Sequence, residues 1–84
     1  MGEIDLLKKK ILYLSTYRGT KELDILISKF VRKIINDLNL EDLRELKNFL
    51  NIDDQEIYDF YFSDIQIKNF ANSKILKLFK DFKI

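Results

Sequence analysis

Apolar residues repeat at helical spacing along almost the whole of this chain, and no proline interrupts them. Residues three and four positions apart lie on one face of an α-helix, so this spacing predicts amphipathic helices. Because proline is the strongest breaker of a helix interior, its absence leaves that pattern intact. Strand-like alternation is not sustained anywhere. The sequence therefore predicts an all-α fold, a compact bundle of about five short helices joined by turns.

The expected helices follow from the apolar spacing and from the polar residues at their ends. The spacing predicts a first helix near residues 3–16 and a second near residues 20–36. Asn39 is expected to cap a third helix, because a side-chain oxygen at that position accepts from the free N–H groups of the first turn. The third helix is expected to bury Leu43, Leu46, Phe49 and Leu50.

The second half of the chain is expected to hold two more helices. Asp53, with Glu56 three positions later, resembles a capping box and predicts the start of a short, aromatic-rich fourth helix. Residues 63–69 are the least periodic stretch and are expected to form a loop, followed by a final helix near residues 70–82. A chain of this length supports one core, so residues 1–84 are expected to form a single helical domain.

The composition excludes several kinds of active site. No histidine or cysteine is present, which rules out a histidine-based catalytic triad, a thiolate nucleophile and a zinc–thiolate centre. Two glycines are too few for a glycine-rich phosphate loop. Four serines are expected at turns or exposed helix positions, as caps or solvated groups. The carboxylates of Asp53, Asp54 and Glu56 could bind a divalent cation, but helix capping explains them more simply.

The charge distribution argues mildly against nucleic-acid binding. The net charge is +1, whereas nucleic-acid-binding domains are usually more basic. An alternative function remains open, that of a small helical nucleic-acid-binding or regulatory protein that uses a lysine-rich last helix. That face is expected to be solvated and carries Lys74, Lys77, Lys80 and Lys83. No apolar run is long enough to span a bilayer, and no signal or transit peptide is recognised, so a soluble protein is expected.

The segment between the first two expected helices is the one that packing explains least. Gly19 is the only interior glycine. In the simpler interpretation it ends the first helix in a left-handed conformation. In the functional interpretation a tight turn presents Arg18 beside the carboxylates of Glu22 and Asp24 as a recognition edge.

Two motifs in this chain resemble those of a known family. The segment from Arg18 to Asp24, RGTKELD, is similar to the Arg-Gly-x-x-Glu-Leu-Asp motif of the FAD assembly factors of succinate dehydrogenase. The segment from Leu50 to Phe60 resembles that family's Leu-x-x-x-Asp-Pro/x-Asp-Leu-aromatic-x-Trp segment. Tyr17 stands where many members have a second arginine. Gln55 stands near their proline, and Phe60 near their tryptophan.

The resemblance implies a helper protein without catalytic residues or a metal. It would bind the flavoprotein subunit of succinate dehydrogenase, or of fumarate reductase, and promote covalent attachment of FAD to a histidine of that subunit. No cofactor would be held stably by this chain, and direct contact with FAD is left open. The expected partner-binding residues are Arg18, Gly19, Glu22, Asp24, Asp54 and Phe60. The free protein is expected to be monomeric, without nucleic acid or membrane insertion, and in the bacterial cytoplasm rather than the mitochondrial matrix.

Overall fold

The computed structural model describes residues 2–16, 21–67 and 73–83 of the chain. No strand occurs within these ranges, and the predicted all-α bundle is confirmed. The helices are α1 (Glu3–Thr16), α2 (Lys21–Ile34), α3 (Leu40–Leu50), α4 (Asp54–Ser63) and α5 (Lys74–Asp81), with a short 3-10 helix η1 (Ile35–Asp37) after α2.

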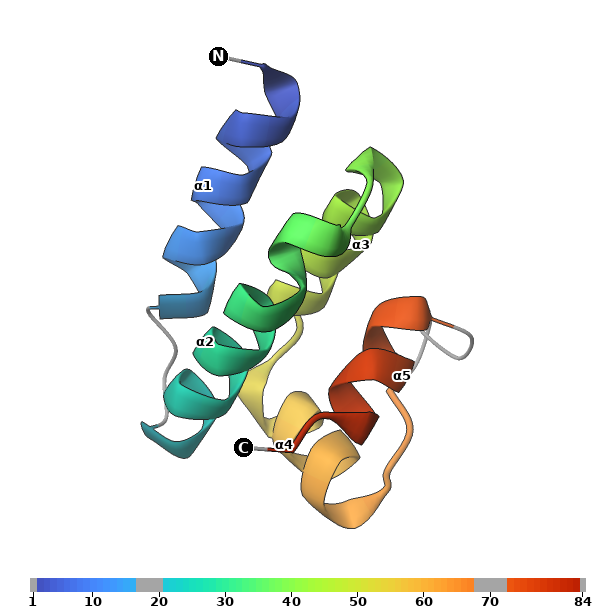
Figure 1. Cartoon of the computed structure of the whole chain (residues 1–84). Coiled ribbons are helices and arrows are strands. Elements are labelled where there is room, and N and C mark those ends of the chain that lie inside the picture. The colour runs from blue at the N-terminus through green and yellow to red at the C-terminus, as the bar shows by residue number, and fades with distance from the viewer. Residues whose placement is uncertain (1, 17–20, 68–72, 84) are drawn as a thin grey trace.

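The helices form an elongated bundle of 40 × 27 × 20 Å (Figure 1). Helix α1 packs against α2 and α3, whereas α5 packs against α3 and α4. The first turn of α2 and the helix α4 lie at the same end of the molecule, and the N-terminus of α1 lies at the other end (Figure 1). The described part of the first motif, residues 21–24, and the α4 part of the second motif therefore share one end of the bundle.

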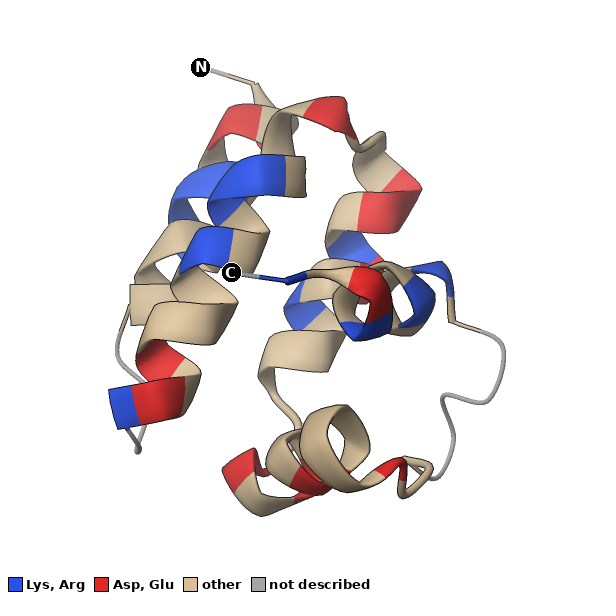
Figure 2. Cartoon of the chain, turned by 60° about the horizontal axis from the view of Figure 1, so that its bottom comes forward, with Lys and Arg blue, Asp and Glu red and all other residues tan. Residues whose placement is uncertain are grey.

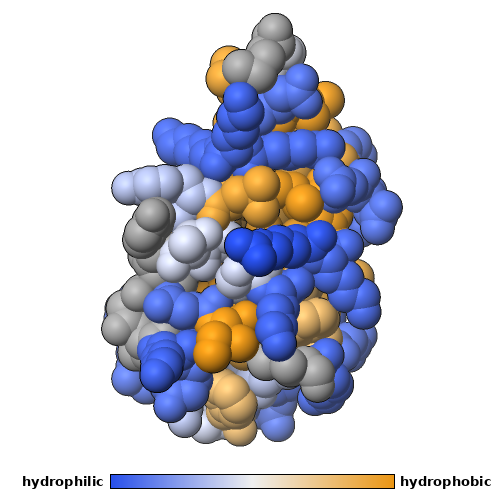
Figure 3. Space-filling view, turned by 60° about the vertical axis from the view of Figure 1, so that its left-hand side comes forward, coloured by the Kyte–Doolittle hydropathy of each residue, from blue (hydrophilic) through white to orange (hydrophobic). Residues whose placement is uncertain are grey.

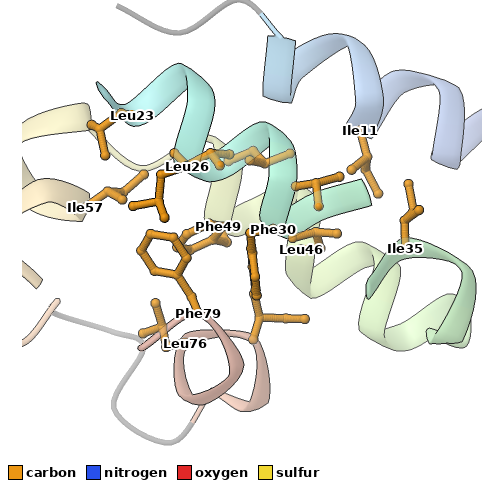
Figure 4. Packing of buried hydrophobic residues seen from close by; sticks show 14 of the residues in the cluster. Ile11, Leu23, Leu26, Phe30, Ile35, Leu46, Phe49, Ile57, Leu76 and Phe79 are labelled. Carbon is orange, nitrogen blue, oxygen red and sulfur yellow. The ribbon is translucent and has the colours of Figure 1, made fainter. Parts of the chain in front are cut away.

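An aromatic cluster joins three of the helices in the core (Figure 4). Phe30 of α2, Phe49 of α3 and Phe79 of α5 are fully buried. The ring centroid of Phe79 lies 5.1 Å from that of Phe30 and 5.1 Å from that of Phe49. Tilted and edge-on pairs at such distances add about 0.5–1.5 kcal/mol each beyond the burial of apolar area. The core thereby fixes α5 against the longer helices.

The start of α3 agrees with the sequence, and the start of α4 agrees only in part. The Asn39 side chain accepts a hydrogen bond from the Asp42 backbone N–H at 2.8 Å, so the predicted cap is confirmed. Asp53 is the N-cap residue of α4, but its side chain makes no capping hydrogen bond. The predicted capping box is therefore wrong at Asp53, because this carboxylate lines a surface hollow instead of turning back onto the helix.

The last helix is shorter than the sequence predicts. It begins at Lys74, because the Ser73 side chain accepts from the Leu76 N–H at 3.3 Å and acts as the N-cap. It ends at Asp81, because Phe82 has an extended backbone. Residues 64–67 are not helical, as expected for the loop, and the positions from 68 to 72 lie outside the described residues.

The serines only partly follow expectation. Ser73 caps a helix, but Ser15 is not at an exposed position. It is almost completely buried and its hydroxyl donates to the Leu12 carbonyl oxygen at 2.8 Å. A hydroxyl that donates to a carbonyl oxygen of its own helix can be buried at little cost. The spacing of apolar residues does not predict such a buried serine.

Lys80 anchors α5 to the end of α4. Its ammonium group donates to the carbonyl oxygens of Phe60, at 2.9 Å, and Tyr61, at 3.1 Å. It also forms an ion pair with Asp64, the residue that ends α4 in a left-handed conformation with φ of 57°. The expected solvated position of Lys80 is therefore wrong, because this cation satisfies carbonyl groups at a helix C-terminus.

Two further lysines of the same segment are also engaged within the fold. Lys74 forms an ion pair with Asp42 of α3 at 3.1 Å. The Lys83 ammonium lies 5.5 Å from the centroid of the Tyr61 ring. Three of the four lysines expected on a solvated face thus contact neighbouring parts of the fold, which weakens the alternative of a phosphate-binding last helix.

Candidate partner-binding site

A surface hollow of about 390 Å³ lies where α2 and α4 begin. It brings together Glu22 and Asp54, which come from the two separate sequence motifs. Both are acidic residues in the first turn of a helix, where a negative charge is favoured by the helix dipole. The full lining consists of Glu22, Leu23, Asp53, Asp54, Gln55 and Tyr58.

Acidic residues predominate on α4, whereas the first turn of α2 carries Lys21 beside Glu22 and Asp24 (Figure 2). Helix α4 has the sequence DQEIYDFYFS, with three acidic residues and no basic one. Within the described ranges, no group of three or more acidic side chains is arranged to hold a metal ion. The possible cation site at Asp53, Asp54 and Glu56 therefore finds no support among the described residues.

Asp24 lies on the other side of α2, in a second hollow of about 300 Å³ against the end of α1. One of its carboxylate oxygens, Oδ1, is buried and has no hydrogen-bond partner among the residues that the structure describes. A buried acceptor without a donor is costly, by about 1–3 kcal/mol. The second hollow also involves Thr16, Ile25, Ser28, Lys29 and Arg32.

Phe60 is half-buried and packs inside the fold. Its ring stacks on Phe79 with centroids 6.5 Å apart, and the Lys80 ammonium lies 5.5 Å from its centroid. It lines a hollow between α4 and α5, away from the one that contains Glu22 and Asp54. Of the other predicted contact residues, Arg18 and Gly19 lie outside the described residues.

A third feature was missed by the sequence interpretation. An apolar groove of about 370 Å³ runs between α2 and α4, lined by Glu22, Ile25, Leu26, Tyr61 and Phe62. Phe62 is 53% exposed and Ile25 is 47% exposed, which is high for large apolar side chains. A sequence signal existed, because the consecutive aromatic residues 60–62 span more than one face of a helix, so one of them must point outward.

The fold and this surface define a small helical protein with an exposed apolar groove between α2 and α4. Comparison with known proteins identifies the family. The sequence model of a family described as "Flavinator of succinate dehydrogenase" matches residues 9–83, and the chain belongs to that family.

Curated relatives agree with this assignment. Succinate dehydrogenase assembly factor 2, mitochondrial, of Saccharomyces cerevisiae is 36% identical over 84 residues, covering 94% of this chain and 51% of that protein. The protein of the same name from Lodderomyces elongisporus is 34% identical over 79 residues, covering 89% and 48%. That of Dictyostelium discoideum is 31% identical over 78 residues, covering 93% and 55%. The chain spans about half the length of these relatives. No solved structure matches it significantly.

These relatives correct one expectation. They are eukaryotic proteins whose names place them in mitochondria, so the expected bacterial cytoplasmic location is wrong. The sequence interpretation relied on the lack of a recognisable targeting peptide, which says nothing about where the folded protein acts. None of the helices among the described residues has the length and apolar character needed to cross a membrane.

Proposed function

We propose that this chain binds the flavoprotein subunit of succinate dehydrogenase and promotes covalent attachment of FAD to that subunit. Membership in a family described as flavinators supports the reaction. One structural observation supports the site: Glu22 and Asp54, which belong to two motifs far apart in sequence, line the same hollow. The proposed contact surface is formed by Glu22 and Asp54, together with Arg18 and Gly19 of the preceding segment.

The chemical step is proposed to occur on the partner, with this chain as a helper rather than an enzyme. The chain has no histidine to which a flavin could be linked. The proposed role is to hold the partner in a conformation in which FAD and its attachment residue are correctly placed, since orientation lowers the barrier of a two-centre reaction. Exposed carboxylates such as Glu22 suit this role because they accept strong, directional hydrogen bonds from cationic donors.

The remaining expected residues have other roles in this proposal. Asp24 is proposed to contact the partner from the other side of α2, in the second hollow. Phe60 is proposed to act indirectly, because its ring packs α4 on α5. A mitochondrial site of action is proposed from the names of the relatives. Action on fumarate reductase is a prediction that rests on the motif resemblance alone.

Co-expression tests the proposal in cells. The chain is produced with a succinate dehydrogenase flavoprotein subunit in a host that lacks its own assembly factor, and covalent flavin is read by in-gel fluorescence after denaturation. The chain is expected to raise the fluorescence of the subunit. Glu22→Gln is expected to lose most of this effect, whereas Glu41→Gln, at an exposed position in the first turn of α3, is its matched control. Equal fluorescence with and without the chain would contradict the proposal.

A further inference from the structure

We infer that the apolar groove between α2 and α4 is part of the partner-binding surface, and that it receives an apolar side chain of the flavoprotein subunit flanked by a lysine or arginine. Resting on the proposed function, this adds a second contact and states the chemistry of its occupant. The residues that carry it are Ile25 on α2 and Phe62 on α4, on opposite walls of the groove.

The Phe62 side chain in the groove is held in place by contacts with neighbouring aromatic rings. The Phe62 ring centroid lies 4.6 Å from that of Tyr58 and 4.8 Å from that of Tyr61. Tyr61 in turn packs on the buried Phe79 at 4.9 Å. Phe62 is thus held by two neighbouring rings while more than half of its surface remains exposed. An ordered, exposed aromatic ring is the kind of residue that anchors a protein interface, because little side-chain entropy is lost on binding.

The groove is continuous with the hollow that contains the motif residues. Glu22 lines both of them. Tyr58 lines the hollow and contacts Phe62, which lines the groove. A partner surface that contacts Glu22 therefore also lies next to the groove. If it contacted the hollow and not the groove, large apolar side chains would stay exposed at the edge of the interface.

Charge complementarity defines the polar part of the occupant. Among the residues that the structure describes, Glu22 is the one charged residue that lines the groove, and Asp53 and Asp54 lie in the adjoining hollow. Helix α4 adds no basic residue along its length (Figure 2). The Lys83 ammonium lies 5.5 Å from the centroid of the Tyr61 ring, so one cation is also near the groove. The carboxylates gather where Glu22 joins the groove to the hollow. There an apolar centre beside carboxylates fits a partner segment with a large aliphatic or aromatic side chain next to a cationic one, since complementary charge steers association.

Exposed apolar residues elsewhere provide a matched comparison. Leu6 on α1 is 56% exposed, as much as Phe62. It lies on the helix whose N-terminus is at the opposite end of the bundle from α4 (Figure 1). On the side of the molecule shown in Figure 3, hydrophobic patches lie between hydrophilic side chains. Leu6 is therefore a control for loss of an exposed apolar side chain outside the groove.

The test measures binding of the full chain to the purified, FAD-loaded flavoprotein subunit by titration calorimetry. Phe62→Ala and Ile25→Ala are each expected to weaken binding by about tenfold or more, whereas Leu6→Ala stays within about twofold. Asp53→Asn is expected to weaken binding by about threefold at low salt and to match the wild type at high salt, because salt screens the lost attraction. Circular dichroism verifies that each variant is folded.

The outcomes separate this inference from the proposed function. If Phe62→Ala and Ile25→Ala bind like the wild type while Glu22→Gln binds weakly, the groove is not part of the surface although the proposed function stands. If the wild type does not bind the subunit at all, both fail. If the free wild type sediments as a dimer that Phe62→Ala dissociates, a second copy occupies the groove and the inference is overturned.

Discussion

Replacing Phe79 by alanine tests whether the aromatic cluster holds the bundle together. Phe79 is fully buried, and its ring centroid lies 5.1 Å from Phe30, 5.1 Å from Phe49 and 4.9 Å from Tyr61. Removing a phenyl ring from such a site costs about 3–5 kcal/mol, because transfer free energy is lost and a cavity remains. A domain of this size has a total stability of about 4–13 kcal/mol, so the loss is a large fraction of the whole.

Urea unfolding followed by far-ultraviolet circular dichroism measures this loss. The neighbouring Leu78 is 37% exposed, and Leu78→Ala is the matched control, with an expected cost below about 1 kcal/mol. Phe79→Leu keeps most of the volume and is expected to cost about 1–2 kcal/mol, which keeps the transition measurable if Phe79→Ala is unfolded. Equal destabilisation by Phe79→Ala and Leu78→Ala would refute the description of the core.

Three further changes probe the ends of the helices, each by urea unfolding. Asn39→Ala removes the α3 cap and is expected to cost about 1 kcal/mol; no change would mean that the cap is dispensable. Lys80→Met removes two hydrogen bonds to α4 carbonyl oxygens and is expected to cost about 1–2 kcal/mol; unchanged stability would show that water replaces them. The hydrogen bond and charge of Lys80 lower the pKa of Asp64 below its usual 3.8. Its stabilising contribution is therefore complete above that value and lost as pH falls through the lowered pKa. Asp64→Asn should remove this part of the acid sensitivity, and an unchanged acid profile would contradict it.

The sequence predicts the helices well, because each helix buries one face and its apolar residues therefore recur every three or four positions. The first expected helix, residues 3–16, coincides with α1, and the inner face expected for α3 is buried throughout. Asn39 is correct because its cap is a local contact within one turn. The predicted Asp53 side-chain cap is wrong, because a capping-box pattern specifies residue types at two positions and does not fix the orientation of an Asp53 carboxylate at the rim of a hollow.

The candidate site is only partly predictable for the same reason. Glu22 and Asp54 were selected through motifs, and the sequence alone does not say that they line one hollow. Lys80 was expected to be solvated because its spacing places it opposite the apolar face of α5, yet the end of α4 lies close enough to accept its hydrogen bonds. The exposure of Phe62 is the exception, because three consecutive aromatic residues span more than one face of a helix and one of them must point outward.

The central claim is that this chain promotes flavin attachment on another protein. Its most direct test is a purified mixture of the succinate dehydrogenase flavoprotein subunit and FAD, with and without this chain, followed over time by intact-mass spectrometry of the subunit. The account predicts that the mass of the subunit increases by one covalently bound FAD faster when the chain is present, and that Glu22→Gln gives little acceleration. An identical time course with and without the chain would contradict the account.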